Sequence, residues 1–338
     1  MQKKWKLQKK YPKKWAAELK DFDDLTLQLA HNRGLKTKEE IESFLNPDYD
    51  RGIHDPFLLK DMDKAVGRIL EAIEKKEKIA IFGDYDADGV CSSVVLAEFF
   101  KAIGYDNFFV YNPDRYKEGY GLTEKAKDEL FRQGAEFIIT IDNGVSSIEE
   151  VYKLNEKGVD VVIIDHHLTR DVLPPARAVV DPKRADDSYP DKMLSATALG
   201  FKVVCAILQK NRFGLVSGWE KWLLDLVAIA SIADMVPLKN ENRILTYWGL
   251  QVLKKTRRLG LKALMRGAGL DMSYVSTDDI AFTISPRINV AGRMDHATLA
   301  GELLTTASLE EAEWLAKQLE EKNAERKILV EQMVKEVR

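Results

Sequence analysis

Acidic side chains follow apolar runs at four places in this 338-residue sequence. The four segments are Asp84-Tyr85-Asp86-Ala87-Asp88, Asp142, Asp165-His166-His167 and Asp234. The last ends a nearly uncharged helical run, where an unpaired carboxylate is costly. Carboxylates that crowd together repel one another unless a cation lies between them, and carboxylates with imidazole suit Mn²⁺ or Mg²⁺. We therefore expect a divalent-metal site in which shared carboxylates bridge two ions.

The elements that surround these acids are expected to bring them together. Short apolar strands alternate with helices from residue 62 to residue 180, which predicts an α/β fold with a parallel sheet flanked by helices. Ligands bind beyond the carboxyl ends of such strands, and three of the strands end in the acidic segments. The predicted strands are 79–82, 107–111, 137–141, 159–164 and 178–180, and the predicted helices are 62–73, 90–103, 123–133 and 147–157.

Beyond residue 194 the pattern is mostly helical. We predict helices at 198–208, 219–233 and 243–255, a short strand at 281–284 and a long charged helix at 309–338. No apolar run reaches the roughly 18 residues that a membrane span needs. The two cysteines, Cys91 and Cys205, lie in apolar helical stretches and are expected to be buried reduced thiols of a cytoplasmic protein.

The first twenty residues carry eight lysines and one glutamate, with Trp5, Tyr11 and Trp15 between them. Lysines that neutralise phosphates, beside rings that stack on bases, would form a surface for a nucleic-acid strand. The alternative is a solvated tail whose rings pack on the body of the protein. Short helices are expected between residues 25 and 45, with Thr37 and Glu40 forming a capping box.

The four acidic segments, the last extended as Ala233-Asp234-Met235-Val236-Pro237-Leu238, resemble in order the first four motifs of the DHH phosphoesterase superfamily. The chain is most similar to the RecJ-like exonucleases, which degrade single-stranded DNA from the 5′ end; segments 112–122, 241–243 and 285–293 support this. The resemblance covers nearly the whole chain. It implies a DHH core at 53–307, between a basic, helical N-terminal extension at 1–52 and a long linking helix at 308–338.

Two departures from the family accompany the resemblance. Segment 194–198 has less glycine than is usual there, which puts the helix packing near the site in question. The glycine-rich substrate-binding module that follows the long helix in the family is not among these residues, so we expect a shortened or minimal form.

The resemblance also assigns roles to individual residues. The implied metal ligands are Asp86, Asp88, Asp142, His166 and Asp234. Asp84 is expected to complete the cluster or orient the attacking water, and His167 to contact the scissile phosphate. Arg287 is expected to stabilise the developing charge and, with Asn289 and Arg293, to face the DNA backbone; the alternative is that the arginines pair with nearby acids. The implied contacts at the site entrance, otherwise an ordinary loop, are Arg115, Tyr116 and Tyr120.

The expected activity is metal-dependent hydrolysis of single-stranded DNA from the 5′ end, in DNA repair and recombination. The resemblance implies a monomer whose partners are single-stranded DNA, a single-strand-binding protein and a helicase, with no membrane. One alternative within the superfamily is a phosphodiesterase for short oligoribonucleotides or cyclic dinucleotides. Another is a catalytically silent replication scaffold, although no metal ligand is visibly lost.

Overall fold

The computed structural model describes residues 4, 6–115, 118–294 and 298–337, with the side chains of residues 293 and 294 excepted. The chain forms two compact units, Met1–Ile53 and His54–Arg338. The helices of the first unit are α1 (Trp15–Glu18), α2 (Asp24–Asn32), α3 (Lys38–Leu45) and α4 (Tyr49–Gly52). The side chain of Asp23 caps α2, and Thr37 and Glu40 form the predicted capping box of α3.

The first unit has a small core of its own. Tyr11 and Trp15 are only 6% and 5% exposed in this core, so their rings are not available for stacking on bases. For these two rings the packing alternative is the one the structure shows, and Trp5 lies outside the described residues. The other members of the core are Leu19, Leu27, Ala30, Leu35 and Ile41.

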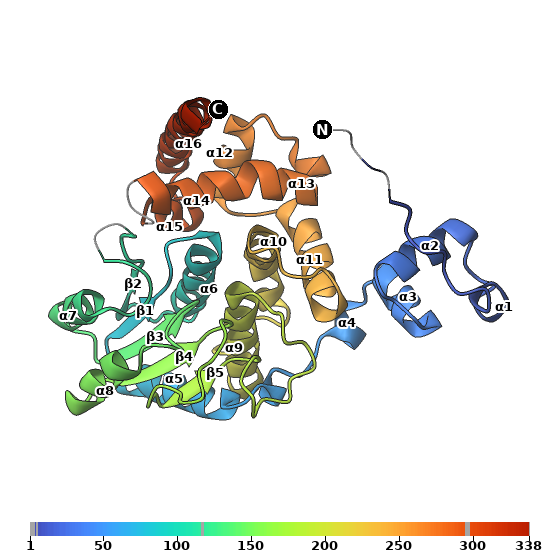
Figure 1. Ribbon diagram of the computed structural model, residues 1–338. Helices are drawn as coiled ribbons and strands as arrows, with labels where there is room; N and C mark the ends of the chain where they lie inside the picture. The colour runs from blue at the N-terminus through green and yellow to red at the C-terminus, as the bar shows by residue number, and fades with distance from the viewer. Residues whose placement is uncertain (1–3, 5, 116–117, 295–297, 338) are drawn as a thin grey trace. The chain divides into compact units, whose positions relative to one another are not determined.

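The second unit is built on a five-stranded parallel sheet with strand order β2-β1-β3-β4-β5 (Figure 1). Its strands are β1 (Ile79–Phe82), β2 (Phe108–Tyr111), β3 (Phe137–Ile141), β4 (Asp160–Ile164) and β5 (Ala178–Val180), which confirms all five predicted strands. After β1 the chain adds β2 on one side and then β3 on the other. Open α/β sheets bind ligands at such a reversal of direction.

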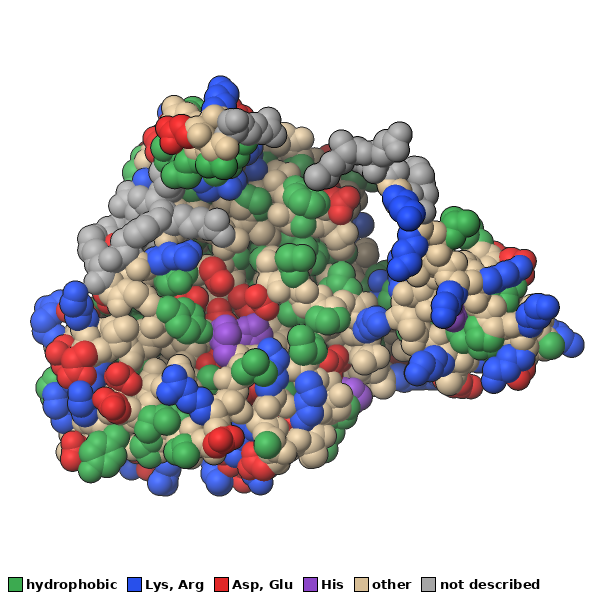
Figure 2. Space-filling view, viewed as in Figure 1, with side chains coloured by type: hydrophobic (Ala, Val, Ile, Leu, Met, Phe, Trp, Pro, Cys, Tyr) green, Lys and Arg blue, Asp and Glu red, His purple; other side chains and the backbone are tan. Residues whose placement is uncertain are grey.

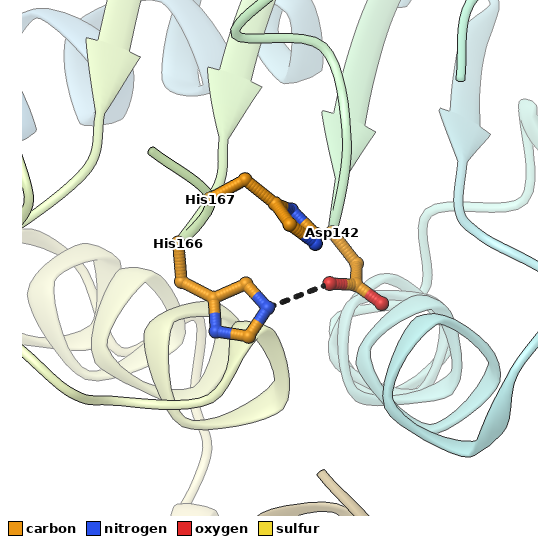
Figure 3. Close-up of side chains that lie close together, drawn as sticks. All are labelled: Asp142, His166 and His167. Carbon is orange, nitrogen blue, oxygen red and sulfur yellow. Dashed lines mark ion pairs between the residues drawn. The ribbon is translucent and has the colours of Figure 1, made fainter. Parts of the chain in front are cut away.

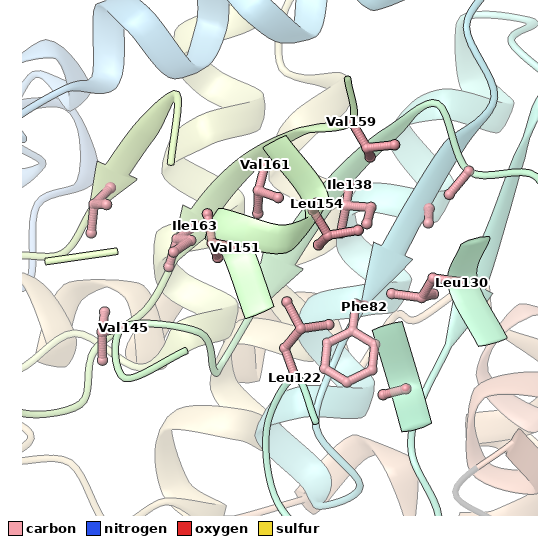
Figure 4. Packing of buried hydrophobic residues seen from close by; sticks show 14 residues of the cluster. Phe82, Leu122, Leu130, Ile138, Val145, Val151, Leu154, Val159, Val161 and Ile163 are labelled. Carbon is pink, nitrogen blue, oxygen red and sulfur yellow. The ribbon is translucent and has the colours of Figure 1, made fainter. Parts of the chain in front are cut away.

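Helices cover both faces of the sheet. Alternate strand residues such as Phe82, Ile138 and Ile163 pack with α7 (Glu124–Arg132) and α8 (Ile148–Glu156) in one buried cluster (Figure 4). Three other helices contact the strands as well: α5 (Met62–Lys75), α6 (Ala87–Ala102) and α9 (Ala196–Lys210). Helix α6 is apolar nearly all round, because it lies between the sheet and further helices.

The remainder of the second unit is helical, as predicted. Its α-helices are α10 (Leu224–Ala233), α11 (Asn240–Leu253), α12 (Leu259–Gly267), α13 (Thr277–Asp279), α14 (Ser285–Met294), α15 (Thr298–Thr305) and α16 (Leu309–Val337). Residues Trp219–Leu223 form a 3₁₀ helix ahead of α10. Helix α10 contacts α6, α9 and α11, so it lies beside the sheet half of the unit. In the described part of the chain, every helix is too short or too polar to cross a bilayer.

The short strand predicted at 281–284 is wrong. Residues Ile280–Ile284 form one turn of π-helix that leads into α14. Ile280 and Ile284 are fully buried, whereas Phe282 is 78% exposed. A strand would place all three on one face, whereas a helix brings only residues four apart to the same side.

Candidate metal centre

The acidic segments converge at the carboxyl edge of the sheet. β1, β3 and β4 are neighbours, so the residues that follow Phe82, Ile141 and Ile164 lie side by side. Potential ligand atoms lie within 4.8 Å of one another in three groups: Asp84, Asp86 and Asp142; Asp142, His166 and His167; and Asp88, His166 and Asp234. In Figure 2 a patch of histidine bordered by acidic side chains lies in the middle of one face. All five predicted metal ligands are therefore brought together, with Asp84 beside them.

His166 lies at the centre of the cluster. Its Nε2 is 3.1 Å from Asp142 Oδ1 and 3.9 Å from Asp88 Oδ2 (Figure 3). Its Nδ1 lies 3.1 Å from the carbonyl oxygen of Leu194 and 3.8 Å from Asp234 Oδ2. A hydrogen bond from Nδ1 to that carbonyl orients the ring so that Nε2 faces Asp142 and Asp88.

Asp88 is fixed by the first turn of α9. The backbone N–H groups of Ala196 and Thr197 donate to its two carboxylate oxygens, each at 2.8 Å. The hydroxyl of Thr197 also donates to Asp88 Oδ1 at 2.6 Å. A carboxylate is stabilised at a helix N-terminus by free N–H groups and by the helix dipole. The segment in which the sequence departs from the glycine-rich family pattern thus orients an acid of the cluster.

Backbone conformation places two other acids. Asp142 has φ of +66°, in the left-handed region that non-glycine residues seldom adopt. The turn that follows it continues through Gly144, with φ of +111°. Gly89 permits the first turn of α6 to approach residues 84–86, the acidic loop. A Cβ at Gly89 would lie 2.5 Å from the backbone nitrogen of Asp84. Asp86 caps α6 by accepting from the N–H groups of residues 88 and 89.

The crowding of acids opposes their ionisation. Burial, assisted by the charge of Asp86, raises the pKa of Asp84 to about 7. Burial and the charge of Asp88 raise the pKa values of Asp86 and Asp142, the latter well above its ordinary value. The same two causes raise the pKa of Asp234 to about 6. Protons and cations therefore compete for one set of oxygens.

His167 belongs to a second arrangement at the rim. Its Nδ1 lies 2.7 Å from Asp165 Oδ1, and this hydrogen bond raises the pKa of His167. Burial alone would raise the pKa of Asp165, but the bond to His167 and the histidine charge hold it below its ordinary value. The hydroxyl of Tyr120 lies 3.2 Å from the His167 ring and donates to the carbonyl oxygen of Asp142 at 3.3 Å. Tyr120 is thus at the site.

Helix α14 contacts the acidic loop through one face. The side chain of Asn289 accepts a 2.8 Å hydrogen bond from the N–H of Ala87. A Cβ at Gly292, one helical turn later, would lie 2.2 Å from the carbonyl oxygen of Tyr85, so this face packs closely on the loop. Asn289 is therefore brought to the site region, where its contact is with the loop backbone.

Arg287 points away from the acidic cluster. Its Nε donates to Glu320 on α16 and its Nη1 donates to the carbonyl oxygen of Thr283 at 2.7 Å. Residues two positions apart on a helix project about 200° apart, so Arg287 and Asn289 cannot face the same partner. In this structure Arg287 pairs with a nearby acid, which was the structural alternative for this arginine, and its expected role toward the DNA backbone stays a prediction.

Of the three predicted contacts that remain, Arg115 has a described side chain, whereas Tyr116 and Arg293 do not. The guanidinium of Arg115 lies 5.2 Å from the centre of the Tyr85 ring, within the acidic loop. This placement agrees with the predicted position at the site entrance. Tyr116 lies outside the described residues. Arg293 is in the last turn of α14, and its side chain is also outside the described part of the chain.

From the sequence, Asp165 was noted only as part of an acidic segment, and Thr197 was given no role. In the structure Asp165 orients His167 and Thr197 orients Asp88. The available signal for Asp165 was its position at a strand end, directly before two histidines. For Thr197 the only signal was a hydroxyl at the start of an apolar helical run, where a partner is needed because the side chain is buried.

The donor set fits a pair of divalent cations. Asp84 Oδ1 is buried and, among the described residues, has no hydrogen-bond partner. Four carboxylates with raised pKa values make up this part of the site, and their mutual repulsion is what a cation would relieve. Oxygen donors with one imidazole suit Mn²⁺ and Mg²⁺ rather than a thiolate-seeking metal.

Comparison with known proteins identifies the relatives of this chain. The family model described as DHH family, N-terminal domain, matches residues 78–231. The single-stranded-DNA-specific exonuclease RecJ of Bacillus subtilis is 39% identical over 312 residues, covering 92% of this chain and 38% of that protein. RecJ of Escherichia coli is 32% identical over 318 residues, covering 91% of this chain and 54% of that protein. The chain thus spans roughly half the length of these curated relatives.

Solved structures show the same relationship. A crystal structure of exonuclease RecJ bound to manganese is 31% identical with a TM-score of 0.75, covering 82% of this chain and 69% of that one. RecJ from Thermus thermophilus in complex with Mn²⁺ is 27% identical with a TM-score of 0.80, covering 97% of this chain and 46% of that one. The predicted fold class is confirmed by these likenesses.

Proposed function

Because this chain belongs to the DHH family and, within it, to the RecJ proteins, we propose that it is a metal-dependent phosphodiesterase that removes 5′ nucleotides from single-stranded DNA. The observation that carries the proposal is that acids from three strand ends and from the end of α10 converge. Their potential ligand atoms form groups in which all atoms lie within 4.8 Å of one another. Its setting is DNA repair and recombination in the cytoplasm.

Mn²⁺ or Mg²⁺ would be held by Asp86, Asp88, Asp142, His166 and Asp234, with Asp84 completing the set. When bound, a pair of such ions supplies Lewis-acid polarisation of the phosphoryl group and lowers the pKa of water. Support for this cofactor comes from the solved RecJ structures, which are complexes with Mn²⁺ or Mg²⁺.

The chain's own residues at the rim act on the phosphate. The hydrogen bond to Asp165 raises the pKa of His167 and orients its ring, which favours the cationic imidazole that a phosphate would attract. Burial raises the pKa of Tyr120, so its phenol remains a hydrogen-bond donor. Arg115 adds a cation beside the acidic loop. These three side chains would bind and orient a phosphodiester whose negative charge increases in the transition state.

A nuclease assay tests the proposal. The chain is incubated with single-stranded DNA labelled at either end, in Mn²⁺, Mg²⁺ or EDTA, beside its Asp142→Asn and His166→Ala variants. We expect metal-dependent release of 5′ nucleotides by the unaltered chain and at least about a 100-fold loss in both variants, since each removes a central ligand. Full activity in either variant would refute the metal mechanism.

The same assay addresses the alternative substrates. Short oligoribonucleotides and cyclic dinucleotides are added as competing substrates, and preferential cleavage of these would replace the proposed substrate. A chain that binds Mn²⁺ yet cleaves none of them would be the silent scaffold. We propose a monomer that works with a single-strand-binding protein and a helicase, because a duplex must be unwound, and the released strand kept single, before an enzyme specific for single strands can degrade it.

A further inference from the structure

Lysines dominate one surface of the N-terminal unit. Within the described part of the chain, Lys9, Lys10, Lys13 and Lys14 are exposed and none forms an ion pair. The only acid among the first twenty residues is Glu18. Figure 2 shows many basic side chains on this unit. Four neighbouring positive charges without acidic partners repel one another, which favours a polyanionic ligand.

Glu18 is exposed and forms no ion pair within the described part of the chain, and the next three acids in sequence are engaged elsewhere. Asp21 pairs with Lys38, and Asp23 caps α2 by accepting from the N–H of Thr26. Asp24 accepts a 2.6 Å hydrogen bond from the hydroxyl of Tyr11. Asp21, Asp23 and Asp24 therefore form no ion pair with the four lysines in the described part of the chain.

The segment that bears the lysines is fixed in place rather than free. The amide of Gln28 on α2 accepts from the backbone N–H of Tyr11 at 3.2 Å and donates to the carbonyl oxygen of Lys9 at 2.9 Å. The rings of Tyr11 and Trp15 stack with their centres 6.4 Å apart inside the core of the unit. Lysines therefore occupy the solvent-facing positions between buried anchors. Less ordering entropy is lost on binding when the backbone is already organised.

We propose that this lysine surface, defined by Lys9, Lys10, Lys13 and Lys14, binds the phosphate backbone of single-stranded DNA. The choice of this polyanion depends on the proposed function of the metal centre. Burial of Tyr11 and Trp15 removes these two rings from base stacking, so the four lysines recognise the strand by charge. Lysine suits this mode because its ammonium is a point charge on a flexible stem. Binding is therefore independent of base sequence and steeply dependent on salt.

A charge-matched comparison tests the surface. The full chain carrying Lys9→Gln, Lys10→Gln, Lys13→Gln and Lys14→Gln is compared with a chain carrying Lys75→Gln, Lys101→Gln, Lys210→Gln and Lys255→Gln. The second set removes the same charge from exposed but scattered positions. A third chain carries arginine at the four clustered positions. Binding to fluorescent single-stranded DNA is followed by anisotropy in EDTA, across a series of salt concentrations.

We expect the clustered glutamine variant to bind roughly tenfold or more weakly at low salt than the scattered variant. Its slope of log affinity against log salt should fall by about 0.7 for each phosphate that a lysine no longer neutralises, and the arginine variant should bind like the unaltered chain. Equal affinities and slopes for the clustered and scattered variants would overturn the proposal. Equal melting temperatures of all the chains exclude unfolding as the cause.

A separate readout distinguishes this proposal from that of the metal centre. Hydrolysis of bis(p-nitrophenyl) phosphate, which is too small to need an extended surface, is measured with Mn²⁺ for each chain. Loss of binding with unchanged hydrolysis supports the lysine surface as a strand-binding site. Absence of hydrolysis in every chain contradicts the proposed function, while the anisotropy comparison still decides the role of the lysines.

Discussion

The hydroxyl of Thr197 lies 2.6 Å from Asp88 Oδ1 and 3.0 Å from the carbonyl oxygen of the same residue. One side chain at the start of α9 thus fixes both the carboxylate and the backbone of an acid at the start of α6. Both residues are buried, so the geometry is protected from water. The orientation of a ligand by a neighbouring donor affects a metal site almost as strongly as the ligand itself.

Replacing Thr197 with Val should weaken metal binding. Valine keeps the shape of threonine but removes the hydroxyl, so Asp88 loses one of its three side-chain hydrogen bonds. We expect roughly a 10-fold or greater rise in the Mn²⁺ concentration that gives half-maximal activity. Thr197→Ser keeps the donor and serves as the control. Identical Mn²⁺ titrations for the Val and Ser variants would show that the hydroxyl has no part in metal binding.

Asp181 should make stability depend on pH. Burial raises its pKa to about 7, and its Oδ2 has no partner among the described residues. The native carboxyl keeps its proton to about pH 7, whereas the unfolded one loses it near its ordinary value. Stability of the unaltered chain therefore falls as pH rises from about 4 to 7. Asp181→Asn removes this dependence and should be about 1–3 kcal/mol more stable than the unaltered chain at pH 8.

Urea unfolding in EDTA at pH 5, 6.5 and 8 measures the effect of Asp181→Asn. Asparagine can still accept the 2.7 Å hydrogen bond from the N–H of Lys183. The difference in unfolding free energy between the two chains should therefore grow with pH. A difference that stays constant across the three pH values would refute the assignment.

Divalent metal should stabilise the chain more at high pH than at low pH. The raised pKa values of Asp84, at about 7, and Asp234, at about 6, mean that protons occupy these oxygens in acid. At pH 8 the metal-free carboxylates repel one another, so Mn²⁺ relieves more repulsion there. Saturation at about a hundred times the dissociation constant adds about 2.7 kcal/mol. Thermal unfolding with and without MnCl₂ at pH 5.5 and 8 measures this.

The control for this metal effect is Asp142→Asn, which removes the carboxylate shared by two of the three ligand groups. Its melting temperature should change little on addition of Mn²⁺. If the unaltered chain gains as much at pH 5.5 as at pH 8, the carboxylates do not titrate against the metal as inferred.

Arg287 and Glu320 should be coupled in stability. The Arg287 side chain is buried against α16, and Glu320 accepts from its Nε. Arg287→Gln and Glu320→Gln should each destabilise the chain, and the double variant should cost less than their sum by about 0.5–3 kcal/mol. Urea unfolding of the four chains gives this coupling free energy. Strict additivity would show that Arg287 and Glu320 are not coupled and would contradict this prediction.

Much of the fold follows from local sequence patterns. The strands of the sheet are short, uncharged runs between turn residues, and burial on both faces makes such runs distinctive. Because parallel strands carry their acidic ends to a common edge, the convergence of the acidic segments could be predicted without coordinates. The starts of α6, α9 and α11 were placed two or three residues too late. Asp86 caps α6, so Asp88 and Gly89 are in its first turn rather than in a loop.

The contacts that the sequence did not predict are those in which packing between distant segments determines the partner of a side chain. Nothing in the sequence near Arg287 indicates that Glu320 will lie beside it, because the two residues are 33 positions apart and belong to different helices. Similarly, Thr197 and Asp88 are 109 positions apart, so their hydrogen bond becomes visible only once α6 and α9 are packed together. The left-handed backbone of Asp142 is likewise not indicated by the local sequence, because residues other than glycine seldom adopt it.

Asp234 has a consequence for the biosynthesis of this protein. Every strand of the sheet has been translated once residue 180 is added, and Asp88, Asp142 and His166 have been translated by then as well. The aspartate at the end of α10 is added later, and α10 must then settle against α6 and α9. A ribosome-bound nascent chain therefore contains every strand of the sheet well before it contains the last acid of the cluster, so the proposed metal centre can be completed only after α10 has been translated.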